Sequence, residues 1–294
     1  MAGSGKKWAI GCGIGCGLIL LIVGGLGTVG YLGIRDLMKR GEKMDSTQEA
    51  LHDAFGDAKD FAPRADGVIP ADRIETFLDV REDLLPDREE LNDILAKLSE
   101  GEAAYENTGK LAKIKAGIRL VPSIMAYGQR RSEVLLQDGM GLGEYLYIYT
   151  LAYYDLLGND PADGPSFKLT GPDDRDEDGQ SGFHWKTEVS NDGDVMAERS
   201  TRIRSHLNDL QTALARNQLT AVDDAIAAGE TGLAAWREQL AAELARMEDE
   251  PRRLLWADGL PEPLRQSLEP YRDRLAAAYM PLVNTVEAGL IDHH

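Results

Sequence analysis

Acidic side chains at every second position are the residues of this chain best suited to chemistry. Asp174, Asp176 and Asp178 are followed directly by Gly179. Alternate carboxylates in a tight loop converge on a hard cation, and glycine permits the sharp turn that such a loop requires. The spacing therefore predicts a calcium site at the three aspartates, and calcium is the one cofactor that the sequence suggests.

The run resembles the first half of an EF-hand calcium loop over six residues only. The twelfth position of such a loop holds a bidentate glutamate, whereas Trp185 stands there, and Ser181 occupies the usually apolar eighth position. The flanking residues alternate as strands do. A solvated acidic loop explains the same residues, so both interpretations stay open.

Motifs that name a reaction are missing from the sequence. It contains no G-x-S-x-G nucleophile elbow, no P-loop and no H-E-x-x-H zinc pair. The glycine-rich residues 138–143 lie between two expected helices, whereas a dinucleotide-binding loop comes after a strand, so we interpret them as an interhelical turn. The sequence favours a protein without catalytic activity and leaves a carboxylate-based hydrolase as the minor alternative.

Tyrosine dominates residues 144–157, which contain five tyrosines in an otherwise apolar run. Taken as a helix, the segment is apolar nearly all round and is expected to be buried on most sides. We assign Tyr145, Tyr149 and Tyr153 to an aromatic-lined pocket or protein-binding groove. A central core helix with hydrogen-bonded hydroxyls explains the pattern equally, and alternation in the first half also allows a strand.

Charge and cysteine content exclude several classes of function. The formal net charge is −18, and such a surface repels nucleic acid, whose binding needs clustered basic residues. The two cysteines, Cys12 and Cys16, lie near the N-terminus. The remainder of the chain therefore has no disulfide and no cysteine-ligated zinc site.

Residues 8–34 form one long uncharged segment, which predicts a single transmembrane helix in contact with membrane lipid. A helix rises about 1.5 Å per residue, so this segment crosses a hydrocarbon core of about 30 Å. Its length and the lack of an A-x-A site argue against a cleaved signal peptide. Gly11/Gly15 and Gly13/Gly17 are small-xxx-small pairs that predict self-association in the bilayer, although a glycine-tolerant anchor without a partner explains them too.

The flanks of this segment give conflicting signals about orientation. Four basic residues lie after it and two before it, which leans towards a cytoplasmic C-terminal side. A short tail before a long apolar run is typical of an uncleaved signal anchor, which exports the part of the chain on its C-terminal side. We favour export, which places the remainder outside the cytoplasm, in the periplasm.

Helical periodicity governs most of the remaining chain and predicts an all-α fold: an N-terminal transmembrane helix, then a multi-helix bundle with a small β/loop insertion. One helix is expected to start at 69–72 and another after Pro86. A third covers about 108–137, with Pro122 kinking or splitting it. The hydrophobic stripe from Met196 to Leu214 predicts a further helix; Val222 and Ile226 open a short element, and a last helix begins at 261–263.

The predicted organisation of the chain has six parts. Residues 158–194 lose helical periodicity, and short strands are expected at 167–170 and 183–189. The parts are a tail (1–7), the transmembrane helix (8–34), a juxtamembrane linker or helix (35–68), the first half of the bundle (69–157), the acidic loop or β-excursion (158–194) and the second half of the bundle (195–294).

The sequence favours a single-pass membrane protein whose acidic helical body acts as an interaction or scaffold module, with a protein partner or a second copy of itself. The alternative is an extracytoplasmic domain that binds a ligand or calcium. The absent catalytic motifs and the helical stripes favour the first hypothesis, whereas the acidic run and the tyrosines favour the second.

Overall fold

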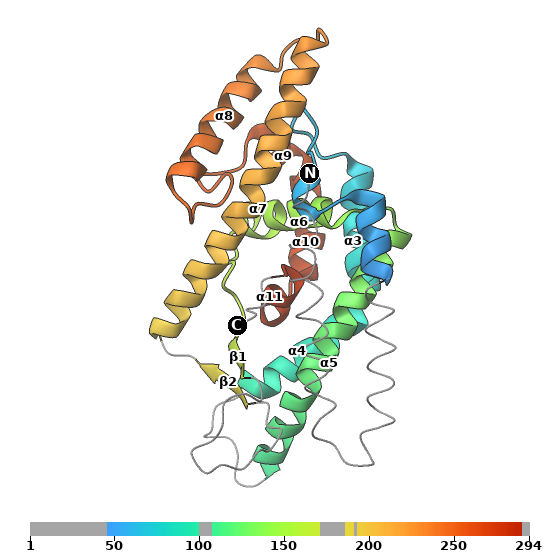
Figure 1. Cartoon of the computed structure of the whole chain (residues 1–294), viewed down its shortest axis with the longest axis vertical. Coiled ribbons are helices and arrows are strands. Elements are labelled where there is room, and N and C mark those ends of the chain that lie inside the picture. Colours follow the sequence, from blue (N-terminus) through green and yellow to red (C-terminus); the bar gives the residue numbers. More distant parts are fainter. Residues whose placement is uncertain (1–45, 100–107, 171–185, 191–192, 290–294) are drawn as a thin grey trace, which may run out of the picture.

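The computed structural model describes residues 46–99, 108–170, 186–190 and 193–289 of the 294-residue chain. Over these ranges the chain is built predominantly of helices (Figure 1), which confirms the all-α class predicted from periodicity. The predicted membrane segment 8–34 lies outside the described residues. Among the helices that are described, none combines the length and the apolar character needed to cross a membrane.

The first half of the bundle matches the predicted helix signals closely. Pro70 stands immediately before one helix and Pro86 is the second residue of the next, where the missing amide hydrogen breaks no helical bond. α5 continues through Pro122, so the proline does not split this helix. The elements are residues 46–55, the 3-10 turn η1 (Ala58–Asp60), α3 (Ala71–Asp83), α4 (Leu85–Ser99), α5 (Thr108–Gln137), α6 (Leu142–Thr150) and the π-helical segment η3 (Leu151–Leu156).

The second half departs from the prediction at two points. Val222 and Ile226 belong to one long helix rather than to a separate element, since no proline or internal glycine interrupts residues 194–227. The expected last helix is broken at Pro270, which cannot donate a helical hydrogen bond. The elements are α7 (Gly193–Ala227), α8 (Ala234–Asp249), α9 (Glu262–Leu268), η4 (Glu269–Tyr271), α10 (Arg272–Ala278), η5 (Pro281–Val283) and α11 (Asn284–Glu287).

Between the halves lies a small antiparallel sheet, as the alternating pattern predicts. β1 (Ser166–Thr170) pairs with β2 (Lys186–Ser190), with Ser166 opposite Ser190 and Thr170 opposite Lys186. The acidic residues that join the two strands are outside the described part of the chain. The β-insertion is therefore present, and its predicted acidic tip stays a prediction.

The arrangement of the helices gives the central role to the tyrosine segment. α4 and α5 run along one side of the molecule and the hairpin of α7 and α8 along the other, with α6, α10 and α11 between them (Figure 1). α6 contacts α3 and α7, while η3 contacts α9 and α10. Buried residues from both halves of the bundle form one continuous core. The prediction of a helix buried on most sides is confirmed, and the strand alternative for this segment is wrong.

Candidate functional site

Two groups of residues singled out in the sequence cannot be placed. Asp174, Asp176 and Asp178, the predicted calcium ligands, lie outside the described residues. So do Gly11, Gly13, Gly15 and Gly17, the glycines predicted to self-associate in the membrane. Within the described ranges, no cluster of three or more His, Cys, Asp or Glu side chains has the geometry to hold a metal ion.

The third predicted site, formed by three tyrosines, is in the interior. Tyr145, Tyr149 and Tyr153 are all 0% exposed. Their rings pack in sequence, with centroids 6.1 Å apart for the first pair and 4.7 Å apart for the second. As the structure stands they are part of the core, and an exposed binding surface at these rings would require the core to open.

Behind these rings lies a buried ionic network that we call the central cluster, formed by Arg81, Arg88, Tyr149, Asn284 and Glu287. Both arginines are 1% exposed and Glu287 is 0% exposed. Arg81 donates to Glu287 Oε2 at 3.1 Å, and Arg88 Nε donates to Glu287 Oε1. The hydroxyl oxygen of Tyr149 lies 2.9 Å from Asn284 Oδ1 and 3.2 Å from Glu287 Oε2. Both carboxylate oxygens of Glu287 are thus occupied.

The central cluster contains two arginines and one carboxylate, so one of the two positive charges is stabilised by other groups. Arg81 and Arg88 both donate to the carbonyl of Ala278. The Arg81 guanidinium also lies 4.7 Å from the ring centroid of Tyr153 and 5.3 Å from that of Tyr149. Carbonyl dipoles and the negative faces of aromatic rings both favour a buried cation. We infer that the central cluster is a structural unit that joins α3, α4, α6 and α11.

At the C-terminal end of the tyrosine segment the helix widens and then stops. η3 is a π-helix, a feature enriched at functional sites. The Leu157 amide donates to the Ala152 carbonyl, and the Asn159 amide donates to the Tyr153 carbonyl at 3.0 Å. Gly158 adopts φ +73°, the left-handed conformation that such a helix end needs. This ending leaves Asp155 on the last turn, beside α7 and α8.

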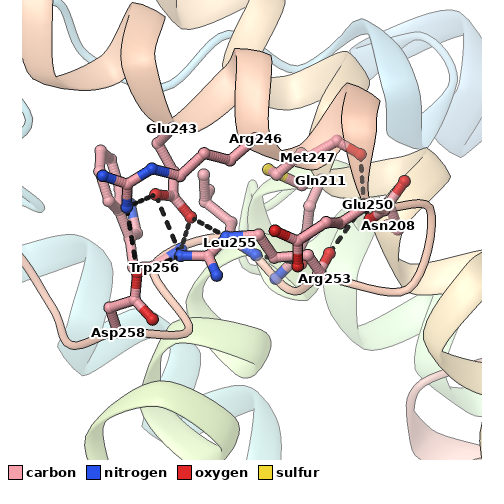
Figure 2. A network of polar contacts seen from close by, with 10 residues as sticks. All are labelled: Asn208, Gln211, Glu243, Arg246, Met247, Glu250, Arg253, Leu255, Trp256 and Asp258. Carbon is pink, nitrogen blue, oxygen red and sulfur yellow. Dashed lines mark hydrogen bonds and ion pairs between the residues drawn. The ribbon is translucent and has the colours of Figure 1, made fainter.

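Opposite this helix end lies a loop, residues 250–260, that we call the Trp256 loop. Glu243 of α8 is 4% exposed and binds the loop through both carboxylate oxygens (Figure 2). Arg253 donates to Oε1 at 3.0 Å and to Oε2 at 3.3 Å, and the Trp256 amide donates to Oε1 at 3.2 Å. Asp258 accepts from Arg253 at 2.6 Å and from Arg246 at 3.0 Å. Every charge in this network therefore has an opposite partner.

Side chains of α7 hold the same loop by its backbone. Gln211 accepts a hydrogen bond from the Leu255 amide at 2.9 Å. The loop would otherwise bury polar backbone groups without partners, which is costly. Asn208 donates through one amide nitrogen to three carbonyls (Figure 2), those of Met247, Glu250 and Arg253.

The central residue of the loop has a strained backbone. Trp256 has φ +62°, and in the described part of the chain it is the one residue other than glycine with a positive φ. An L-residue in this region costs about 1–2 kcal/mol, and such strain is found preferentially at functional sites. The indole is 4% exposed and packs against Trp236 at a centroid distance of 5.5 Å. The strained residue thus carries an indole that packs against Trp236 of α8 and contributes to the wall of a pocket.

A pocket of about 380 Å³ opens between η3, α7 and the Trp256 loop. A volume of this size suits a small ligand. A smaller pocket of about 170 Å³ lies on the other side of Trp256 and Gly259. The larger one, which we call the Asp155 pocket, is lined by Tyr154, Asp155, Gly158, Asn159, Asp160, Pro161, Arg204, Leu254, Trp256, Ala257 and Gly259.

Two residues that line this pocket have buried polar atoms without a hydrogen-bond partner among the described residues, the Trp256 indole Nε1 and the carboxyl of Asp155. Asp155 is the acidic one of the two. Its Oδ2 is shielded from solvent and has no hydrogen-bond partner among the described residues. Burial raises the pKa of the Asp155 carboxyl well above its ordinary value, and the negative charge of Glu243 raises it further. An isolated acid with a raised pKa beside a cavity marks a candidate functional site.

The other charged groups that line the pocket, Asp160 and Arg204, are paired with each other, and Glu243 lies outside its lining. The Nη2 atom of Arg204, on α7, lies 3.3 Å from Asp160 Oδ1. Glu243 cannot act as a free base, because its oxygens accept from Arg253 and the Trp256 amide. General acid–base catalysis needs a second group that is free to exchange a proton. The arrangement therefore suits binding of a ligand better than catalysis.

Comparisons with known proteins identify no relative. No family model matches the sequence, and the chain matches neither a curated protein nor a solved structure. The function must therefore be inferred from the site itself.

The sequence carried one signal that pointed to Asp155. It is the only acidic residue between Tyr145 and Leu157 in a helix that is otherwise apolar, and a lone acid in a buried helix needs either a partner or a function. The pocket could not be predicted from sequence, because the facing wall is formed by residues 250–260, which are far from Asp155 along the chain. The strained φ of Trp256 left no sequence signal at all.

Proposed function

We propose that this protein is a membrane-tethered helical binding module that takes a small ligand in the Asp155 pocket. The observation that carries the proposal is the meeting of three features in one cavity. These are a carboxyl without a partner, an aromatic ring fixed by a strained backbone and the end of a π-helix.

The apolar segment 8–34 supports the tether, and the signal-anchor pattern supports a location outside the cytoplasm. The proposal thus keeps the single-pass topology expected from the sequence. It replaces an unspecified protein partner with a small ligand, because the described surface offers a pocket with an unused polar group. Calcium binding at 174–178 stays a separate prediction.

A pocket-blocking variant tests this function directly. Ala257 lines the pocket and is exposed, so Ala257→Phe places a ring in its mouth without touching Asp155. Ala235→Phe is the matched control, because Ala235 is exposed on α8 and does not line the pocket. Ligand-observed NMR of the full chain in detergent would use a mixture of small amines, alcohols and carboxylates.

We expect at least one class of compound to bind the unmodified protein and Ala235→Phe but not Ala257→Phe. Equal binding by all three proteins would place the binding elsewhere. Absence of binding by every compound would contradict the proposed function.

A further inference from the structure

The charges around the Asp155 pocket do not balance. Asp160 is paired with Arg204 across the pocket. Beneath it, Glu243 is paired with Arg253, and Asp258 accepts from both Arg253 and Arg246. The four carboxyl groups Asp155, Asp160, Glu243 and Asp258 thus face three arginines, and among these four Asp155 is the one without a cationic partner. When Asp155 is ionised, these four carboxylates therefore carry one negative charge more than the three arginines balance.

We propose that the ligand of this pocket is a small organic cation, a protonated amine with an apolar body, which binds between the Asp155 carboxyl and the Trp256 ring. This inference rests on the proposed function, since it names the class of ligand for the same pocket. An ammonium group donates hydrogen bonds to a carboxylate, and its charge is attracted to the face of an indole.

Other ligand classes fit the pocket less well. An anion would meet Asp155 and Asp160, while the one arginine that lines the pocket is already paired. A hard metal ion needs several oxygen ligands, and no cluster of three such groups occurs among the described residues. A quaternary ammonium carries no N–H donor for the carboxyl. A protonated primary amine supplies the positive charge and the N–H donor that the Asp155 carboxyl lacks, and rotation of this side chain brings the shielded Oδ2 to the cavity.

The charge of the whole chain favours the same class. A formal net charge of −18 creates a negative potential that concentrates cations near the protein and repels anions. The apolar part of the ligand has a matching wall, since Leu254, Trp256 and Ala257 line one side of the pocket. The pocket is large enough for an amine with a single aromatic ring or a short alkyl chain.

Three probes of similar shape and different charge separate the classes: phenethylamine, 2-phenylethanol and phenylacetate. Calorimetric titrations would use the full chain in detergent, with detergent alone as the blank. We expect phenethylamine to bind at least about tenfold more tightly than 2-phenylethanol, and phenylacetate not to bind detectably.

Substitution of Asp155 tests the contact itself. Asp155→Asn keeps the shape of the side chain and removes its charge, so affinity for phenethylamine should fall about tenfold, to that of the alcohol. Asp138→Asn is the control, because Asp138 is an aspartate with a pKa raised mainly by burial that does not line the pocket. Ala257→Phe should abolish binding even if Asp155→Asn folds poorly.

The pH dependence gives an independent readout. Burial and the Glu243 carboxylate on α8 raise the pKa of Asp155. The other titratable or charged groups near it are the Tyr147 hydroxyl and the Asp160–Arg204 pair on the pocket wall. Raising the pH from about 5 to about 8 ionises more of the Asp155 population, so affinity for the amine should rise. A neutral ligand that accepts a hydrogen bond from the protonated Asp155 carboxyl would show the opposite trend.

The outcomes distinguish this inference from the proposed function. If 2-phenylethanol or phenylacetate binds more tightly than the amine, or if Asp155→Asn leaves amine affinity unchanged, the cationic class is wrong while the pocket stands. If none of the three probes binds while a compound of the NMR mixture still binds in a way that Ala257→Phe abolishes, the amine inference is contradicted and the proposed function stands. If the mixture gives no binding either, both are contradicted. Amine binding that depends on Asp155 and Ala257 supports both.

Discussion

Two regions of this molecule contain carboxyl groups shielded from solvent, and the hydrogen bonds made by these carboxyl groups differ between the two regions. In the central cluster, Glu287 is 0% exposed and each of its oxygens accepts from an arginine. At the Asp155 pocket, the carboxyl lies beside a cavity and Oδ2 has no partner among the described residues. Glu287 is buried and Asp155 is partly exposed, and the two carboxyl groups differ in whether the surrounding residues complete their hydrogen bonds.

This contrast separates structural from functional carboxyl groups on the contacts that each of them makes. A buried carboxylate whose oxygens both accept hydrogen bonds stabilises one arrangement of helices and has no capacity left for a ligand. A buried group without a partner costs stability. Arg81 Nε and the Tyr153 hydroxyl also lack partners among the described residues, and Asp155 differs from them in lying beside a cavity. Glu243 is a useful third case, since it lies next to the pocket but is saturated like Glu287.

The largest effect is expected at Glu287, whose two carboxylate oxygens both accept from arginines. Glu287→Gln removes the negative charge that faces Arg81 and Arg88, which leaves two buried cations without a counterion. We expect the free energy of unfolding to fall by about 3–5 kcal/mol, measured by urea denaturation. Glu262→Gln at the exposed pair with Arg265 is the control and should leave the midpoint unchanged. A small effect of Glu287→Gln would remove the distinction between the two regions.

A smaller loss is expected at Glu243. Glu243→Gln removes the charge that faces Arg253, but Arg253 keeps Asp258 at 2.6 Å. We expect a loss of about 2–3 kcal/mol, again by urea denaturation. The same variant should lower the pKa of Asp155, because the repulsion by Glu243 is removed. A pKa that stays in place would show that the two carboxyl groups do not interact.

Two tyrosines extend the contrast to hydroxyl groups on neighbouring turns. Tyr149→Phe removes a hydroxyl that contacts both Asn284 and Glu287, so we expect a loss of about 1–2 kcal/mol. Tyr153→Phe removes a buried hydroxyl without a partner in the described residues, and stability should stay the same or rise slightly. Thermal unfolding of both variants measures the two changes in stability. An equal loss of stability in Tyr149→Phe and Tyr153→Phe would contradict the distinction between a partnered and an unpartnered hydroxyl.

The smallest effect has the opposite sign. Asp155→Asn should stabilise the protein by about 1 kcal/mol near pH 8, a rise in midpoint temperature of about 2–4 °C. The folded state raises the pKa of Asp155, so the unfolded state binds fewer protons above the ordinary aspartate range and folding becomes less favourable as the pH rises. The gain should vanish near pH 4. A destabilised variant at pH 8 would indicate that Asp155 supports the fold.

Helical periodicity alone was sufficient for much of the fold. The starts after Pro70 and near Pro86, the helix 108–137 and the buried tyrosine segment were all predicted from sequence. Local rules succeed here because each helix buries its own apolar stripe. They failed at Val222 and at Pro270, where the length of a helix depends on packing against distant elements and on the exact position of a proline.

The candidate site was much less predictable than the fold. Asp155 and Trp256 are about a hundred positions apart in sequence, and only the packing of η3 against the second half of the bundle brings them to one pocket. The sequence pointed instead to tyrosines, whose rings are in the core. Composition cannot distinguish an aromatic core from an aromatic pocket, because both need the same apolar rings.

The central claim is that the carboxyl of Asp155 is reserved for a ligand. It is tested best by an NMR titration of the Asp155 side-chain carbon in the full chain, with and without phenethylamine. We predict a pKa well above that of an ordinary aspartate in the free protein and a clear decrease when the amine is added. An ordinary pKa that the amine leaves unchanged would contradict the claim.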